Sequence, residues 1–253
     1  MIDVKNKAVL VTGGSGGIGG AICQLFSEQG ARVAVHYHRD KEGASTTLDR
    51  LKGEGHTLVQ GNVAEPAEAR RVVLETVSKL SRLDILVNNA GIMPAHPLTE
   101  LDYAAWQEAW QATIRTNLLG PAYLSHCAVE EMLKNGGGKI VNITSRGAFR
   151  GEPDAPAYGA SKAGLNAMSQ SLAKALAPRN IYVYAVAPCF VDTARVADIL
   201  NGPQGEDVRN QSPLGRVAKP EEVARTVLFL ASEGSEFLTG CIVDVNGASY
   251  LRT

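Results

Sequence analysis

The segment YGASK places Tyr158 and Lys162 four residues apart within a stretch of helical period. Side chains four apart on a helix stand on the same face, one turn from each other. Tyrosine is a poor acid–base catalyst at its usual pKa of about 10, and a neighbouring ammonium favours the phenolate and lowers that pKa. Taken alone, such a pair is more often a surface tyrosine beside a solvated lysine, so its chemistry depends on the elements that position it.

Seven short apolar runs, rich in valine and isoleucine, alternate with longer segments of helical period. Because the runs mostly lack alternating polar residues, they indicate strands buried on both faces of a parallel sheet. The alternation predicts right-handed crossovers and a doubly wound, seven-stranded parallel sheet between two layers of helices, a three-layer α/β/α fold. The predicted strands are 8–12, 32–36, 57–60, 84–87, 139–144, 181–187 and 241–245. The predicted helices are 17–29, 41–53, 66–80, 103–118, 121–134, 157–177 and 220–232.

The 253 residues are predicted to form one domain, 1–253, since no repeat or low-complexity linker divides them. The segment 192–216 breaks the rhythm, because Gly202, Pro203 and Gly205 interrupt it and it contains no clear strand. A loop of this length in a compact domain is usually a lid or a binding loop. We therefore expect 192–216 to be a flexible flap over the substrate.

Composition and charge exclude several classes of function. The net charge is −1 with no basic or acidic tail, so neither nucleic acid nor an anionic membrane is expected as a partner. No run approaches the roughly 18 apolar residues that span a bilayer, and the N-terminus lacks the apolar stretch of a signal peptide. The four cysteines form no CxxC pair and indicate reduced thiols. We expect a cytoplasmic protein.

A glycine-rich turn, TGGSGGIG (12–19), follows the first predicted strand directly and opens a helix. Glycines at such a place let the backbone turn tightly and approach a pyrophosphate, whose charge lies at the helix N-terminus. A lone glycine cluster is weak evidence, because tight strand–helix turns use glycine for steric reasons alone. Its position after the first strand strengthens it, and the absence of a following Gly-Lys-Ser/Thr excludes a P-loop.

The spacing of Gly13, Gly17 and Gly19 behind Thr12 resembles the fingerprint of the short-chain dehydrogenase/reductase family. The chain is most similar to the 3-oxoacyl-[acyl-carrier-protein] reductase branch, and the matching motifs cover nearly all of it in order. This resemblance implies a Rossmann fold and an oxidoreductase that interconverts a ketone and a secondary alcohol. The further motifs are Asn88-Asn89-Ala90-Gly91, Asn117 in TNLLG, Ser145 thirteen residues before Tyr158, PLGR (213–216), KPEEVA (219–224) and FLTGCIVDVNGA (237–248).

The resemblance implies a catalytic role for each of four residues. In the reductive direction, Tyr158 would donate a proton to the carbonyl oxygen while the nicotinamide delivers hydride to the carbonyl carbon. Ser145 would donate a hydrogen bond to that oxygen and stabilise its developing charge. Lys162 would hold the nicotinamide ribose hydroxyls and lower the pKa of Tyr158. Asn117 would fix a water that links Lys162 to solvent, and an asparagine that satisfies backbone groups is compatible with this role.

The same match implies a nicotinamide dinucleotide site. Asn89, Ala90 and Gly91 would line the adenosine and ribose side, although such a stretch is also an ordinary strand–loop turn. Asn62 replaces the aspartate that usually accepts from the adenine amino group, and its amide oxygen can still accept. The residues expected at the cofactor are Gly13, Ser15, Gly16, Gly17, Ile18, Tyr37, His38, Arg39, Asn62, Val63, Asn89, Ala90, Gly91, Tyr158, Lys162, Pro188, Val191 and Thr193.

NADP(H) is favoured over NAD(H) by the end of the second predicted strand. NAD-specific relatives carry an acidic residue there, which bonds the adenosine ribose hydroxyls. Here the position holds Tyr37, followed by His38 and Arg39. No carboxylate in that position repels a 2′-phosphate, and Arg39 can pair with it. Gly16 argues the other way, because many NADP-dependent relatives have a basic residue there.

Two further features suggest alternatives to this scheme. His36 and His38 could face the same way on a strand as metal ligands, but the spacing offers no third ligand and the reaction needs no metal, so we expect no metal site. Cys189 replaces the glycine that relatives carry after the proline beside the nicotinamide. If that glycine has a positive φ, a Cβ there costs energy or reshapes the pocket. Cys189 is either a tolerated substitute or a reactive thiol.

The sequence leaves the substrate open. Acyl-carrier reductases dock their acidic partner through basic residues near the active-site entrance. Arg179 matches one such position, although it is equally a solvated helix-end cation, and Gly136 occupies another. Because half of that patch is missing, acyl carrier protein is not favoured as partner over a small-molecule ketone, diketone, sugar or steroid. The resemblance also implies a homotetramer.

Two alternative functions remain. An NAD(H)-dependent dehydrogenase of the same family would oxidise an alcohol, a sugar or a steroid. A catalytically silent nucleotide-binding protein would act as a redox sensor or interaction module. The complete set of Asn117, Ser145, Tyr158 and Lys162 argues against the silent protein, and Cys189 is the one feature in its favour.

Overall fold

A computed structural model describes residues 3–252 of the chain. Its seven strands form one sheet in the order β3-β2-β1-β4-β5-β6-β7, and every pair of neighbouring strands is parallel. The prediction of a doubly wound parallel sheet between helical layers is therefore confirmed. The strands are β1 (Ala8–Val11), β2 (Arg32–Tyr37), β3 (Thr57–Gln60), β4 (Ile85–Asn88), β5 (Gly138–Ile143), β6 (Ile181–Pro188) and β7 (Ile242–Val245).

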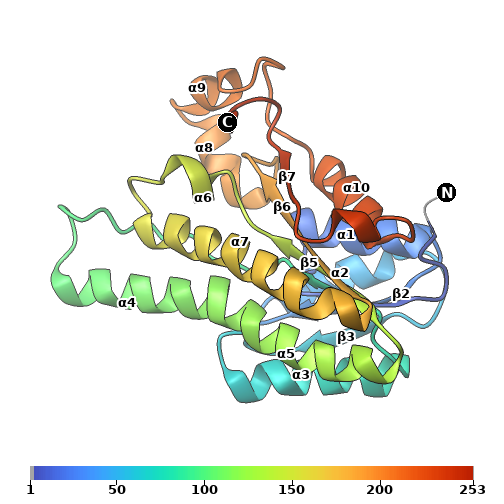
Figure 1. Cartoon of the computed structure of the whole chain (residues 1–253). Coiled ribbons are helices and arrows are strands. Elements are labelled where there is room, and N and C mark those ends of the chain that lie inside the picture. Colours follow the sequence, from blue (N-terminus) through green and yellow to red (C-terminus); the bar gives the residue numbers. More distant parts are fainter. Residues whose placement is uncertain (1–2, 253) are drawn as a thin grey trace.

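Helices cover both faces of this sheet, with α1 and α10 on one side and α3, α5 and α7 on the other (Figure 1). The α-helices are α1 (Gly17–Glu28), α2 (Lys41–Asp49), α3 (Pro66–Leu80), α4 (Tyr103–Ile114), α5 (Gly120–Lys134), α6 (Gly147–Arg150), α7 (Pro156–Leu176), α8 (Ala197–Asn201), α9 (Gly205–Asn210) and α10 (Pro220–Ala231). A π-helix spans Arg115–Leu119, and 3₁₀ turns span Ala177–Arg179, Ala194–Val196 and Glu236–Leu238.

The strands are apolar because all but β7 contribute side chains to two hydrophobic cores. In β1, Val9 and Val11 pack into the core formed with α1, α2 and α10. Ala8 and Leu10 point the other way, into the core formed with α3, α5 and α7. All four residues are buried, which leaves no solvent-facing position for a polar side chain and explains the missing alternation.

The structure differs from the predicted elements in three places. The predicted helix 103–118 and its successor are joined without a break, because α4 passes through the π-helix directly into α5. The predicted helix 41–53 ends at Asp49. The segment 192–216 is not a structureless loop, since it carries a 3₁₀ turn, α8 and α9. Within residues 3–252, no helix is both long enough and apolar enough to span a bilayer.

The strand order fixes where a site can form. The chain winds outward from β1 to β3 and then, from β4, outward in the opposite direction to β7. At such a reversal the connections after β1 and β4 diverge to opposite faces, and a crevice opens beyond the carboxyl ends of the two strands. The glycine-rich turn follows β1 and the segment Asn89–Gly91 follows β4, so both border this crevice.

Candidate active site

A cleft of about 1100 Å³ runs along the carboxyl ends of the strands. Every residue expected at the cofactor lines it, from Gly13 in the first turn to Thr193 after β6. Ser145, Tyr158 and Lys162 line the same cleft. The structure thus brings together all of the predicted site residues except Asn117, which is fully buried behind the wall.

The glycine-rich turn has a backbone that residues with a side chain rarely adopt. Gly13 and Gly17 have φ values of 64° and 54°, in the left-handed region. A Cβ on Gly19 would lie 2.1 Å from the carbonyl oxygen of Gly13, so α1 begins in direct contact with the turn. The free N–H groups of the first turn of α1 face the cleft beside this bare backbone. These residues fit a pyrophosphate, whose negative charge is stabilised at a helix N-terminus.

Side chains from the ends of β1 and β4 hold this turn in place. Thr12 Oγ1 donates to Val87 O at 3.2 Å and accepts from the backbone N–H groups of Asn89 and Ala90 at 2.9 and 3.0 Å. Asn89 Nδ2 donates to the carbonyl oxygens of Thr12 and Gly13 at 2.8 and 3.1 Å. The side chain of Asn89 therefore positions the turn, while its backbone borders the cleft.

His36 braces the turn from β2. Its Nδ1 accepts from Gly13 N at 3.2 Å, and its Nε2 donates to Gly61 O at 3.0 Å, which requires the neutral ring. Burial lowers the pKa of His36 to about 4. Both ring nitrogens are engaged with backbone, so His36 serves the fold and not a metal. Among residues 3–252 no cluster of three or more histidine, cysteine, aspartate or glutamate side chains is arranged to hold a metal ion.

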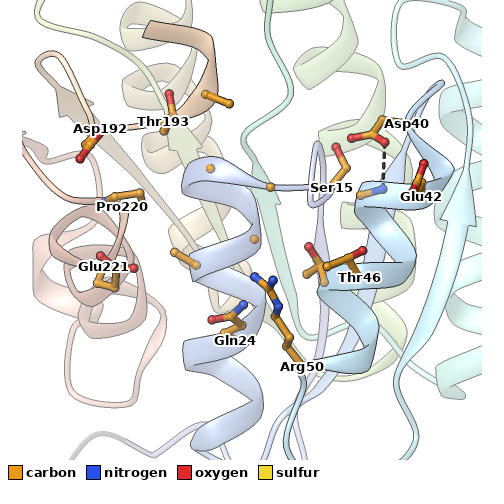
Figure 2. A pocket seen from close by; sticks show the side chains of 17 residues that line it. Ser15, Gln24, Asp40, Glu42, Thr46, Arg50, Asp192, Thr193, Pro220 and Glu221 are labelled. Carbon is orange, nitrogen blue, oxygen red and sulfur yellow. Dashed lines mark hydrogen bonds between the residues drawn. The ribbon is translucent and has the colours of Figure 1, made fainter. Parts of the chain in front are cut away.

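The cleft continues past the outer side of the turn into a pocket of about 580 Å³ between α1, α2 and the start of 192–216 (Figure 2). Ser15 and Asp40 face it from one side and Asp192 and Thr193 from the other. Sequence reasoning did not weigh Asp40. Its carboxylate caps α2 and accepts from Gly43 N at 2.9 Å, so it is already committed to the helix N-terminus.

The end of β2 presents one uncommitted cation. Tyr37 is buried, whereas His38 and Arg39 are exposed at the cleft. Within the described residues the Arg39 guanidinium forms neither an ion pair nor a hydrogen bond. It is therefore available to an anionic group at the adenosine end of the cleft.

Tyr158 and Lys162 stand one turn apart near the start of α7, as the sequence predicts. Lys162 Nζ donates to Ile143 O at 2.7 Å and lies 5.7 Å from the centre of the Tyr158 ring. Burial lowers the pKa of Lys162 to about 7, and the positive charge of Arg195 acts in the same direction. Lys162 can therefore exchange a proton near neutral pH.

The predicted effect of Lys162 on Tyr158 is not what dominates in this structure. Burial raises the pKa of Tyr158 above its usual value of 10, and the neighbouring Glu152 adds to this. The Ser145 hydroxyl and the charge of Arg195 oppose the increase. The physical reason is that desolvation penalises the phenolate and the ammonium alike, so both groups shift toward their neutral forms.

Asn117 lies in the π-helix and acts on the wall of the cleft. Its Oδ1 accepts from Ile92 N and its Nδ2 donates to Ile92 O, both at 2.8 Å. Nδ2 also donates to Ser161 Oγ at 3.2 Å. These bonds fix the segment after β4 against α7, and they correspond to the backbone-satisfying arrangement that the sequence allows. The predicted role of Asn117 in holding a water stays a prediction.

Two departures from the family pattern are accommodated. Cys189 does not have a positive φ, so the strain that a Cβ could cause there does not arise. Its N–H continues the sheet by donating to Val245 O at 3.2 Å, and its thiol donates to Phe190 O at 3.2 Å. Asn62 uses its amide oxygen within its own turn, where it accepts from Ala64 N at 3.1 Å.

The two positions considered for an acidic carrier protein are not at the entrance of this chain's cleft. Gly138 N donates to Asn180 O at 3.0 Å, which brings the neighbourhoods of Gly136 and Arg179 together at the amino ends of β5 and β6. Tyr158 is near the start of the 21-residue α7 and Arg179 follows its end. At 1.5 Å per residue the two lie roughly 30 Å apart.

Sequence reasoning missed three arginines that line the cleft, Arg115, Arg146 and Arg195. Arg195 reaches from 192–216 across the cleft, where Nη2 donates to Gly91 O at 2.9 Å. Arg146 directly follows Ser145 at the end of β5, and this adjacency was a usable signal. Arg195 gave none, because its contact partner is 104 residues away in sequence.

Comparison with known proteins shows similarity over the whole chain. A family profile described as "Enoyl-(Acyl carrier protein) reductase" matches residues 13–248. The 3-oxoacyl-[acyl-carrier-protein] reductase of Staphylococcus aureus is 37% identical over 247 residues, 97% of this chain and 98% of that protein. Its Thermotoga maritima namesake is 37% identical over 249 residues, 96% and 98% of the two chains. A crystal structure of a dehydrogenase/reductase from Sinorhizobium meliloti 1021 matches with a TM-score of 0.90 at 30% identity, covering 99% of this chain and 97% of that one.

The brace formed by His36 makes stability depend on pH. The folded pKa of about 4 lies below the ordinary 6.5, so between these values the unfolded chain binds more protons. The contribution of the neutral ring is complete above pH 6.5 and is lost toward pH 4, at up to about 1.4 kcal/mol per pH unit. In His36→Gln, the free energy of unfolding, measured by urea denaturation from pH 7 to 4.5, should fall less steeply than in the wild type. The exposed His126→Gln is the control, and equal slopes for His36→Gln and wild type would contradict the assignment.

Proposed function

The chain belongs to the short-chain dehydrogenase/reductase family, and we propose that it is an NADPH-dependent reductase that converts a ketone into a secondary alcohol. As a member it is an NAD(P)-dependent oxidoreductase acting on CH–OH groups. The observation that carries the proposal is the single cleft in which Ser145, Tyr158 and Lys162 lie beside the glycine-rich turn.

The residues of the cleft suit a dinucleotide along its whole length. The turn at Gly13–Gly19 would hold the pyrophosphate, Arg39 the 2′-phosphate, Asn89–Gly91 the adenosine and ribose side, and Lys162 the nicotinamide ribose. A Cβ on Gly91 would come within 3.2 Å of Asn117 Oδ1 and 3.6 Å of Lys162 Nζ, so the bare glycine keeps this part of the cleft open. When bound, the cofactor supplies the hydride that reduces the carbonyl carbon.

The proton comes from Tyr158 in this proposal. Because burial raises the pKa of Tyr158, its phenol is protonated at neutral pH and can donate to a carbonyl oxygen. The Ser145 hydroxyl stabilises the charge that develops on the same oxygen. Lys162, with a pKa of about 7, can then resupply the proton to the tyrosine. This distribution of protons favours the reductive direction.

A 3-oxoacyl thioester is the first substrate to consider. The Staphylococcus and Thermotoga relatives are named for reducing 3-oxoacyl groups on acyl carrier protein. The placement of Arg179 far from Tyr158 gives no support to docking of a carrier protein at the entrance formed by this chain alone. A smaller ketone, diketone, sugar or steroid therefore remains the alternative, with NAD(H) in place of NADP(H) as the alternative cofactor.

The test is oxidation of NADPH and of NADH, followed by absorbance, with acetoacetyl thioesters and a panel of diketones, sugars and steroids. We expect NADPH-dependent reduction of at least one ketone. Tyr158→Phe should lower turnover a hundredfold or more, because the proton donor is gone. It should change the dissociation constant of NADPH only a few-fold. Retained turnover in this variant contradicts the mechanism, and tight NADPH binding without any reduction favours the silent redox sensor.

The cofactor preference is tested at Arg39. Arg39→Ala should weaken NADPH binding tenfold or more and NADH binding less than threefold, because only NADPH offers the 2′-phosphate. Arg50→Ala is the matched control, since Arg50 lines the adjoining pocket at the far end of α2 (Figure 2). Titration of intrinsic fluorescence with each nucleotide gives the dissociation constants. Equal losses for the two nucleotides would refute the contact with phosphate.

We also propose that the protein is a homotetramer and that 192–216 moves as a flap. Large apolar side chains that a partner chain could cover include Tyr103 and Phe237, which are 75% and 104% exposed. Light scattering on a sizing column should give four times the mass of the 26.8 kDa chain. A monomeric mass would reject the tetramer. Hydrogen exchange in 192–216 that does not slow when NADPH is added would reject the flap.

A further inference from the structure

Arg146 is a buried cation in the wall of the active-site cleft. Its side chain follows Ser145 at the end of β5, is only 3% exposed and lines the cleft together with Tyr158. Arginine stays protonated in proteins, so its charge must be balanced where it is buried. Buried arginines almost always have a paired anion.

Within residues 3–252, no carboxylate lies within ion-pair distance of Arg146. The nearby Glu152 pairs with Arg150, at 3.7 Å. The two terminal nitrogens of Arg146 contact neutral groups instead: Nη1 donates to Ser249 Oγ at 2.6 Å, and Nη2 donates to Gln211 Oε1. Burial lowers the pKa of Arg146 and the charge of Arg150 lowers it further, while Cys189 and Glu152 act in the opposite direction.

The Gln211 amide oxygen marks a position that an anion would fill better. Arg150 Nη1 also donates to it, at 3.5 Å, so two guanidinium groups converge on one neutral oxygen. That oxygen comes from the far part of the segment 192–216, whose first residues, 193–196 and Ile199, line the cleft, whereas Gln211 itself is outside the lining. The centre of the Phe190 ring lies 5.3 Å from the guanidinium carbon of Arg146, within the range of a cation–π contact. A carboxylate offers two oxygens and a full charge to such a fork.

We propose that Arg146 binds a carboxylate of the substrate, so that this protein reduces oxo acids to hydroxy acids. The inference rests on the proposed function, since it names the substrate class of the same cleft. In the complex the substrate carboxylate takes the place of Gln211 Oε1 on Nη2 of Arg146. The ketone then lies toward Ser145, the residue directly before Arg146 in the chain. Arg195 gives this end of the cleft a second positive charge.

Binding can be measured without turnover, because the oxidised cofactor cannot reduce a ketone. The protein saturated with NADP⁺ is titrated calorimetrically with acetoacetate, levulinate and 5-oxohexanoate and with the methyl ester of each. At least one acid should bind tenfold or more tightly than its ester. Arg146→Gln should abolish this preference, and Arg146→Lys should keep part of it, because lysine retains the charge without the fork. Arg70→Gln, on the exposed face of α3, is the matched control and should keep all of it.

A second variant separates substrate binding from a purely structural role of Arg146 in holding 192–216. Gln211→Glu supplies the protein's own carboxylate to Arg146. In the proposed site this carboxylate competes with the acid, so the acid should lose its advantage while ester affinity changes less than threefold. If Arg146 only holds the segment, Gln211→Glu strengthens that contact and the preference for acids survives. This variant decides the question even if Arg146→Gln does not fold, which thermal denaturation would show.

Equal affinity of acids and esters in the wild type would overturn the proposal, as would an acid preference that persists in Arg146→Gln or Gln211→Glu. Reduction of the same six compounds by NADPH is scored separately. Esters reduced as well as acids would refute the carboxylate site and leave the proposed reductase intact. An acid preference in binding without reduction of any ketone would refute the reductase and leave the anion site standing.

Discussion

The site depends on one close contact, between Gly13 in the glycine-rich turn and Gly19 in the first turn of α1. With no side chain on Gly19, the helix begins against the carbonyl oxygen of Gly13, closer than any Cβ would permit. A backbone this bare still needs partners for its polar groups. Three strands provide them, through Thr12 after β1, His36 in β2 and Asn89 after β4. The backbone at the crevice between β1 and β4 is thus held in place by side chains whose hydrogen bonds go to the backbone.

Electrostatics in the cleft follows from the same burial. Desolvation raises the pKa of Tyr158 and lowers the pKa of Lys162. Both shifts favour the neutral form of the side chain. The charge of Arg195 discriminates between them, since it disfavours the ammonium and favours the phenolate. Because Arg195 belongs to the segment 192–216, that segment contributes to the proton affinity of both groups, after burial.

Local pattern was sufficient to predict the sheet and most of the layers. Apolar runs buried on two faces locate strands well, so β4 at Ile85–Asn88 differs from the predicted 84–87 by one residue. Pro66 at the first helical position set the start of α3 at the predicted residue. The short helices α8 and α9, of five and six residues, are below the length at which periodicity is visible.

The site was predictable in its members and less so in its interactions. The order and spacing of the family motifs identified Ser145, Tyr158 and Lys162, because that spacing places them near the carboxyl ends of neighbouring strands. It could not show that burial dominates the pKa of Tyr158, or that the charges of Arg195 and Glu152, from other elements, also act on it. Nor could it show that Cys189 avoids a positive φ, because backbone angles at that position depend on its pairing with Val245. The contacts of Arg146 could not be predicted for the same reason, because its partners Ser249 and Gln211 are distant in sequence.

The π-helix at Arg115–Leu119 has a consequence for how the long helical arm tolerates change. A π-turn is an α-helix with one surplus residue, and each residue of an α-helix turns the chain by about 100°. The surplus residue therefore sets the rotation of α4 about the helix axis relative to α5. With this rotation α4 faces α7, while α5 faces the sheet and α3. Loss of a single residue here would leave a smooth helix and rotate α4, with Trp106 and Trp110, whose ring centres lie 5.4 Å apart, away from α7.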